Sequence, residues 1–65
     1  MSRKELSALR VKRLERGLTL EFVSKHVGVS IWRLSRIERG LETRAWERDS
    51  LKDFYEAYDD GEIRS

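Results

Sequence analysis

The chain has 65 residues, of which 40% are charged, and its net charge is +2. This length suits a single small domain, which buries only about 60% of the surface of its unfolded chain. Cysteine is absent, so disulfides and thiolate metal sites are excluded. No apolar run approaches the roughly 20 residues of a membrane span, and no signal peptide opens the chain. We therefore expect a soluble intracellular protein with no membrane partner.

The two parts of the chain carry opposite charge. Residues 1–40 contain ten Lys or Arg and four Glu, a net charge of +6, whereas residues 41–65 contain four Lys or Arg and eight Asp or Glu, a net charge of −4. A basic first part and an acidic end suggest two surfaces with different partners. Solvated helix faces account for the same numbers, so charge alone leaves both interpretations open.

Helical spacing of apolar residues begins near the N-terminus. The pattern predicts a first helix over about 3–16, ended by Gly17, because glycine accepts the left-handed backbone of a helix end. Leu6, Leu9, Arg13 and Leu14 fall near one stripe of this helix.

Two short helices follow, each opened by a hydroxyl residue. Thr19 is predicted to be the N-cap of a helix that reaches about Val27, and Ser30 the N-cap of a helix over about 31–39. Gly40 ends the third helix in the way that Gly17 ends the first.

The C-terminal part predicts one more helix. Residues 41–46 form a loop or a short helical turn, and Asp49 or Ser50 caps a fourth helix, which completes a domain over 1–59. The apolar stripe of this helix consists of Leu51, Phe54, Tyr55 and Tyr58. Residues 60–65 are expected to be a flexible C-terminal tail. The fold class is therefore predicted to be a compact all-α domain.

The segment from Leu20 to Arg39 meets the positional requirements of a helix-turn-helix. The motif needs apolar residues on the inner faces of both helices, a small residue where the helices cross, and a turn glycine followed by an apolar anchor. The residues at these positions are Val23, Val27, Ser24, Gly28, Val29, Leu34 and Ile37. Helix pairs of this kind place the second helix in the major groove of DNA.

Several stretches resemble the lambda-repressor/Cro-type (Xre) family of DNA-binding proteins. They are residues 9–19, residues 20–39 and especially Leu-Ser-Arg-Ile-Glu-Arg-Gly at 34–40. The resemblance covers about residues 6–41. It implies a four- to five-helix lambda-repressor-like domain, and members of this family usually bind operator DNA as homodimers. The family often has a glutamine at the position of Leu20, where it helps to grip the DNA backbone, and leucine has no polar group for that contact.

The third helix has an inner and an outer face. At about 100° per residue, Leu34, Ile37 and Leu41 point toward the core. The opposite face carries Val29, Trp32, Arg36 and Arg39. The resemblance implies contacts to bases or adjoining backbone at Ser30, Ile31, Trp32 and Arg36. Arg36 suits the O6 and N7 atoms of guanine, and Ile31 or Trp32 suits the methyl group of thymine.

Basic and helix-terminal residues are candidates for phosphate contacts, which position a protein without reading sequence. They are Arg10, Lys12, Arg16, Thr19, Arg33, Arg39 and Arg44. For Arg33, at the edge of the outer face, plain solvation is an equally open interpretation. The resemblance also implies a structural ion pair between Arg13 and Glu38, which links the first helix to the end of the third.

The aromatic residues of the C-terminal part are candidates for the core and for a dimer interface. They are Trp46, Phe54, Tyr55 and Tyr58. Because a chain this short has a limited interior, we expect part of this set to face a second subunit, a position that Tyr and Trp suit. His26 stands alone on a polar helix face without a second ligand, so we predict no metal site and no cofactor.

These features favour a sequence-specific regulator of transcription that binds double-stranded DNA, a Cro-like repressor of a phage or mobile element, in the cytoplasm with the nucleoid. Two alternatives stay open: an excisionase-like architectural factor that bends DNA, and a protein-interaction module such as an antitoxin or anti-repressor. An enzyme is the weakest interpretation, because the chain has no Cys, one His and no paired carboxylates beside a plausible pocket. No small-molecule ligand is indicated.

Overall fold

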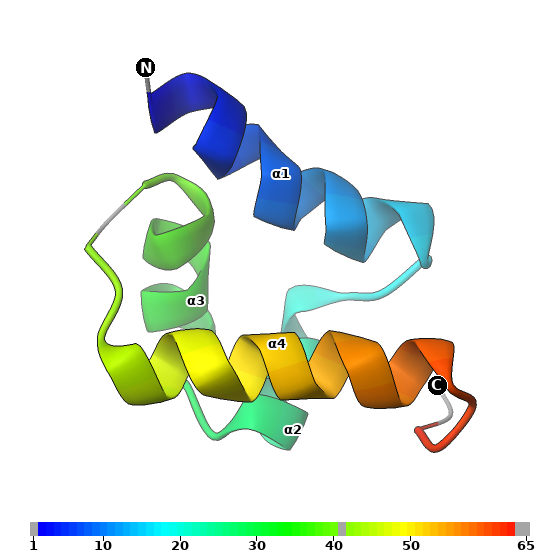
Figure 1. The fold of residues 1–65 in the computed structure, drawn as a ribbon. Helices are drawn as coiled ribbons and strands as arrows, with labels where there is room; N and C mark the ends of the chain where they lie inside the picture. The colour runs from blue at the N-terminus through cyan, green and yellow to red at the C-terminus, as the bar shows by residue number, and fades with distance from the viewer. Residues whose placement is uncertain (1, 41, 64–65) are drawn as a thin grey trace.

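The computed structural model describes residues 2–40 and 42–63, with side chains from Ala8 onward. Its four helices are α1 (Ser2–Glu15), α2 (Leu20–Val27), α3 (Ile31–Glu38) and α4 (Ala45–Asp59), and the described residues contain no strand. In Figure 1, α4 runs across the front of the molecule, α1 crosses above it, and α2 and α3 lie behind. α3 packs against both α1 and α2, and α2 also packs against α4. The predicted all-α fold class is confirmed.

The helix-turn-helix consists of α2 and α3, and its ends form as the sequence predicts. Thr19 Oγ1 accepts a hydrogen bond from the N–H of Phe22 at 3.0 Å, and Ser30 Oγ accepts one from the N–H of Arg33 at 3.1 Å. Gly28 ends α2 with a φ of 74°, in the left-handed region that a β-carbon disfavours. Both predicted N-caps and the predicted turn glycine are confirmed.

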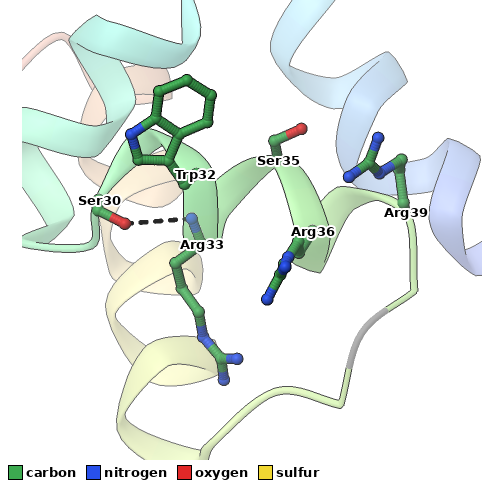
Figure 2. Close-up of a pocket in the computed structure, with 6 residues that line it drawn as sticks. All are labelled: Ser30, Trp32, Arg33, Ser35, Arg36 and Arg39. Carbon is green, nitrogen blue, oxygen red and sulfur yellow. Dashed lines mark hydrogen bonds between the residues drawn. The ribbon is translucent and has the colours of Figure 1, made fainter.

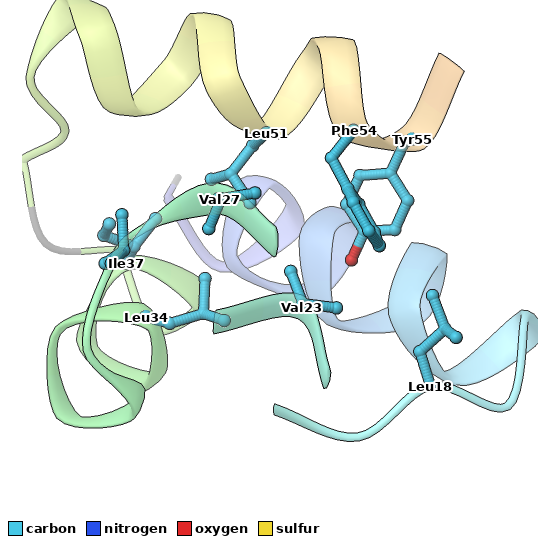
Figure 3. Close-up of a cluster of buried hydrophobic side chains, with 9 residues drawn as sticks. Leu18, Val23, Val27, Leu34, Ile37, Leu51, Phe54 and Tyr55 are labelled. Atoms are coloured by element: carbon cyan, nitrogen blue, oxygen red, sulfur yellow. The ribbon is translucent and has the colours of Figure 1, made fainter. Parts of the chain in front are cut away.

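One apolar cluster fills the space between α4 and the helices behind it (Figure 3). Its members are Leu18, Val23, Val27, Val29, Leu34, Ile37, Leu51, Phe54 and Tyr55. Val23 of α2 and Leu34 of α3 are 0% and 1% exposed. The inner positions expected of the motif therefore form the centre of the domain.

Among the described side chains of α1, only Leu9 is an apolar residue packed against this cluster. Of the stripe, Leu14 is 53% exposed, whereas Leu9 is partly buried against the cluster. The chain instead buries Leu18, which follows the end of the helix. The side chain of Leu6 and the whole of Leu41 lie outside the described residues.

The expectation that Val29 shares the outer face of the third helix is wrong. Val29 is 4% exposed and belongs to the apolar cluster. It precedes the first residue of α3, so the rotation of about 100° per residue does not apply to it. The hydroxyl of Ser24 donates a hydrogen bond to the carbonyl oxygen of Val29. Ser24 thus joins the two helices across the turn, in addition to being small enough for their crossing.

α4 begins earlier than the sequence predicts, at Ala45 rather than after Asp49 or Ser50. The reason is Glu47, whose Oε1 accepts a hydrogen bond from the backbone N–H of Arg44 at 2.9 Å. This bond satisfies one of the amide groups that the start of a helix leaves unpaired. The expectation of an Asp or Ser at the N-cap position misses this helix start, because the capping carboxylate belongs to the third residue of the helix.

The end of α4 is folded back rather than forming a free tail. Gly61, with a φ of 83°, donates its N–H to the carbonyl of Tyr58 at 3.0 Å, and Glu62 donates to Ala57 at 2.9 Å. This pair of bonds is a Schellman motif. Ile63 then packs, partly buried, against the apolar cluster. The structure thus gives residues 61–63 contacts with the domain, where the sequence predicts a flexible tail over 60–65, and residues 64–65 lie outside the described part of the chain.

Candidate nucleic-acid interface

One face of α3 is open to solvent and surrounds a shallow hollow of about 620 Å³. The lining residues are Ser30, Trp32, Arg33, Ser35, Arg36 and Arg39. The side chain of Trp32 is 77% exposed. In Figure 2, Trp32 and Ser35 project from one edge of α3, whereas Arg33 and Arg36 project from the other. The helix thus presents an apolar ring and basic groups around the same surface.

The guanidinium groups of Arg36 and Arg39 are uncommitted. Both residues are exposed, and neither side chain has a hydrogen-bond or ion-pair partner among residues 2–40 and 42–63. Each guanidinium carries five N–H donors in a planar fork that matches the acceptor pairs of guanine or phosphate. These two arginines are therefore available to an outside ligand.

The guanidinium of Arg33 is committed to α4. Its Nε donates to Oε2 of Glu47 at 2.8 Å, and its Nη2 donates to Oε1 at 2.7 Å. Nη2 also donates to the carbonyl oxygen of Glu42 at 3.2 Å. Figure 2 shows the side chain reaching toward the start of α4. Plain solvation of Arg33 is therefore wrong, and a phosphate contact would require this ion pair to break.

Glu47 is the residue of this region that the sequence analysis missed. Its side chain is 2% exposed and accepts hydrogen bonds from Arg33 and from the backbone N–H of Arg44. The bonds from Arg33 are the main reason that the pKa of Glu47 falls from 4.5 to about 2, against the opposing effect of burial. The available signal was a glutamate in the first turn of a helix, where a carboxylate pairs with free amide groups.

A second ion pair holds α1 against the end of α3. Arg13 Nε lies 2.8 Å from Glu38 Oε2, and Arg13 Nη2 donates to Glu38 Oε1 at 3.1 Å. Nη1 of the same guanidinium donates to the carbonyl oxygen of Leu18 at 3.0 Å. The ion pair implied by the family resemblance is present, with Arg13 and Glu38 only 9% and 6% exposed. The ion pair holds the end of α3 against α1, and the face of α3 that carries Trp32 and Arg36 stays open to solvent.

The basic end of α1 faces α4 rather than the hollow. Arg16 makes two hydrogen bonds to the carboxylate of Asp59, both at 2.8 Å, and these bonds lower the pKa of Asp59. The Arg16 guanidinium carbon lies 5.4 Å from the centroid of the Tyr55 ring, and Lys12 Nζ lies 5.7 Å from it. Burial raises the pKa of Tyr55 to about 12, so the ring beneath these cations remains protonated.

Comparison with known proteins identifies the family. A helix-turn-helix family model, of the lambda-repressor, Cro and Xre type, matches residues 9–45, which is more than half of the chain. The chain belongs to this helix-turn-helix family. Neither the curated proteins nor the solved structures give a match. The family binds double-stranded DNA, so the protein is a DNA-binding helix-turn-helix regulator.

The regulator carries its four predicted base-contact residues at the start and middle of α3. Ser30, Trp32 and Arg36 are exposed, and Ile31 is partly buried. The predicted phosphate contacts are more dispersed. The exposed ones are Arg10, Lys12, Thr19, Arg39 and Arg44. Arg16 and Arg33, by contrast, are bound to carboxylates of the same chain, Asp59 and Glu47, which a sequence without its fold does not reveal.

The predicted dimer-interface residues divide into two groups. Phe54 and Tyr55 are each 4% exposed within the single chain, so they belong to the core, the other role that the sequence left open for this set. Tyr58 is partly buried, and its hydroxyl lies 3.5 Å from the carbonyl oxygen of Arg16. Trp46 is 50% exposed. Of this aromatic set, Trp46 therefore keeps the largest free surface.

His26 contacts aromatic neighbours. Its ring centroid lies 4.4 Å from that of Phe22, and its Nδ1 lies 3.0 Å from the Phe22 carbonyl oxygen. Within the described part of the regulator, no group of three or more His, Cys, Asp or Glu side chains is arranged to hold a metal ion. None of the helices described is both long and apolar enough to cross a membrane.

Proposed function

We propose that this regulator is a Cro-like repressor, which binds a specific operator through α3 and blocks transcription by occupying that sequence. The observation that carries the proposal is the open face of α3, with Trp32 77% exposed and Arg36 unpaired among the described residues. A helix of about 10–12 Å diameter fits a major groove about 12 Å wide. The Arg13–Glu38 ion pair supports this role, because it fixes α3 from behind.

The side chains of α3 suit the reading of base edges. Arg36 has the two parallel donors that guanine O6 and N7 accept. Trp32 offers a large apolar surface, and the thymine methyl is the apolar group that a major groove presents. Ser30 and Ile31 stand at the start of the same helix, where base contacts of a helix-turn-helix concentrate.

Phosphate contacts would complete the interface. Arg39 and Arg44 flank the connection between α3 and α4, and both are exposed. Arg10 and Lys12 supply further charge on α1, although Lys12 lies beside the Tyr55 ring. The N-termini of α2 and α3, which begin after Thr19 and Ser30, add backbone N–H groups and a favourable dipole.

The proposal includes a homodimer on DNA. Two copies would bind a pseudo-palindrome with half-sites about 34 Å apart, one turn of the duplex. Trp46 is the aromatic residue proposed for the contact between subunits, because it is half exposed at the start of α4. Trp46→Ala should then weaken pairing on a two-site duplex and leave binding to an isolated half-site unchanged.

Selection of duplexes from a random pool tests the proposal most directly. Bound sequences should converge on a motif with two-fold symmetry, and footprinting should show protection of two half-sites. Transcription from a promoter that contains the selected motif should fall as regulator is added. Binding without sequence preference would remove operator recognition, strong bending at adjacent sites would favour the architectural role, and increased transcription would overturn repression.

A further inference from the structure

The ion pair between Arg33 and Glu47 lies at the border of the DNA-binding face, and the proposed function gives it no role. Arg33 lines the same hollow as Trp32 and Arg36. Its guanidinium is nevertheless held on α4, with N–O distances of 2.8 and 2.7 Å. When DNA binds, the Glu47 carboxylate and a DNA phosphate would compete for this one cation.

Burial gives Glu47 the advantage in this competition. The side chain is 2% exposed, and Arg33 supplies its side-chain hydrogen bonds among the described residues. If Arg33 left, an ionised carboxylate would remain in the interior with the Arg44 N–H as its remaining bond, which is strongly unfavourable. A DNA phosphate without Arg33 keeps its water and counterions instead. Arg33 is therefore expected to stay on Glu47 in the complex.

We propose that Glu47 is a positioning residue that limits the sequence-independent affinity of the regulator by holding Arg33 away from DNA phosphates. The inference rests on the proposed binding of DNA through α3. A phosphate contact by an arginine strengthens binding to every sequence alike, because phosphates carry no sequence information. Glu47 thus removes one cation from the non-specific attraction and leaves the base-reading face of α3 unchanged.

The variant Glu47→Gln tests this role, because it keeps the shape of the side chain and removes its charge. Affinity is measured on the selected duplex and on a random duplex across about 50 to 200 mM salt. Release of Arg33 to a phosphate should steepen the slope of log K against log salt by about 0.9 on both duplexes. This corresponds to about 3.5-fold more affinity lost over that range. The ratio between the two affinities should not change.

Two control variants separate this effect from others. Glu56→Gln makes the same change in net charge at an exposed position of α4, and its slope should match the wild-type value. Adding Arg33→Gln to Glu47→Gln should return the slope to the wild-type value, because the released cation is gone. A Glu47 that only supports the fold would instead lower affinity for the selected duplex and reduce the ratio.

A measurement on the wild-type protein decides the matter if Glu47→Gln does not fold. The Nε–H signal of Arg33 is followed by NMR with and without the selected duplex. In the complex, the signal should keep the chemical shift of the free protein, in which Nε–H is bound to the Glu47 carboxylate, and its exchange with solvent should remain slow. A shift of this signal on DNA binding, or an unchanged slope for a folded Glu47→Gln, overturns the role of Glu47 alone. Failure of the wild-type protein to bind either duplex overturns the proposed function itself.

Discussion

Arg13 and Glu38 meet between α1 and α3, although 25 positions separate them in the chain, with Nε 2.8 Å from Oε2. The two side chains are only 11% and 6% exposed. Each buried charge requires the other, so the pair fixes how α3 sits against α1. A second ion pair, between Arg33 and Glu47, connects α3 to the start of α4.

The buried pair predicts a strong asymmetry between single and double variants. Glu38→Leu should lower the free energy of unfolding by about 3 kcal/mol, because Arg13 remains buried without its counter-charge. That is a large share of the roughly 3–10 kcal/mol expected for a chain of this length. Arg13→Met combined with Glu38→Leu should recover most of the loss in urea unfolding at neutral pH. Additive losses would contradict the coupling.

The depressed pKa of Glu47 predicts a limit to stability in acid. Hydrogen bonds from Arg33 hold this pKa at about 2 in the folded chain, against 4.5 for an ordinary glutamate. The unfolded chain therefore binds a proton first, and the stability due to this group is complete above pH 4.5 and is lost as pH falls toward 2. Urea unfolding of Glu47→Gln should show a shallower loss over this range. The lowered pKa of Asp59 contributes equally to the wild-type protein and to the variant, so it does not produce a difference between them. Parallel curves of stability against pH for the two proteins would contradict the prediction.

The turn of the helix-turn-helix predicts a small and specific cost of adding a side chain. Gly28 has a φ of +74°, and no atom beyond its two chain neighbours lies within 4 Å of the position that a β-carbon would take. Gly28→Ala should therefore lose about 1 kcal/mol from backbone conformation alone, without a steric clash. Gly28→Asn is the matched control and should lose less, since asparagine tolerates this region. Equal thermal stability of all three proteins would contradict this account.

Local signals in the sequence were sufficient for the helix-turn-helix. Thr19 and Ser30 cap the helices that follow them, and those hydrogen bonds span only three residues. The start of α4 was not predictable in this way. Glu47 serves the helix start and Arg33 at the same time, and the second of these contacts exists only once α3 and α4 pack together.

The outer face of α3 followed from helical rotation, but the state of its charges did not. Trp32 and Arg36 point outward because the opposite positions are apolar and buried. In the sequence, Arg16 and Arg33 are basic residues that cannot be told apart from Arg36. Their carboxylate partners, Asp59 and Glu47, lie 43 and 14 positions away in the chain. Which cations are free for DNA is therefore a property of the tertiary fold.

Arg36 predicts a loss that depends on DNA sequence. Arg36→Ala should weaken binding to the selected duplex by about 1–3 kcal/mol and relax base preference at one position of the half-site. Arg36→Lys keeps the charge but not the planar pair of donors, so it should lose most of the same preference. Competition binding with single-base variants of the operator measures both effects. A uniform loss on all sequences would assign Arg36 to a phosphate instead.

Arg39 and Arg16 form a matched pair for the salt dependence of binding. Arg39 is exposed and has no partner for its guanidinium among the described residues, whereas Arg16 is neutralised by Asp59 through two bonds of 2.8 Å. Arg39→Gln should reduce the magnitude of the salt slope by about 0.9, because one fewer phosphate is neutralised. Arg16→Gln makes the same change in net charge and should leave the slope unchanged. Equal slopes for the two variants would show that the basic residues act through total charge, and not through the individual guanidinium groups that the fold leaves free.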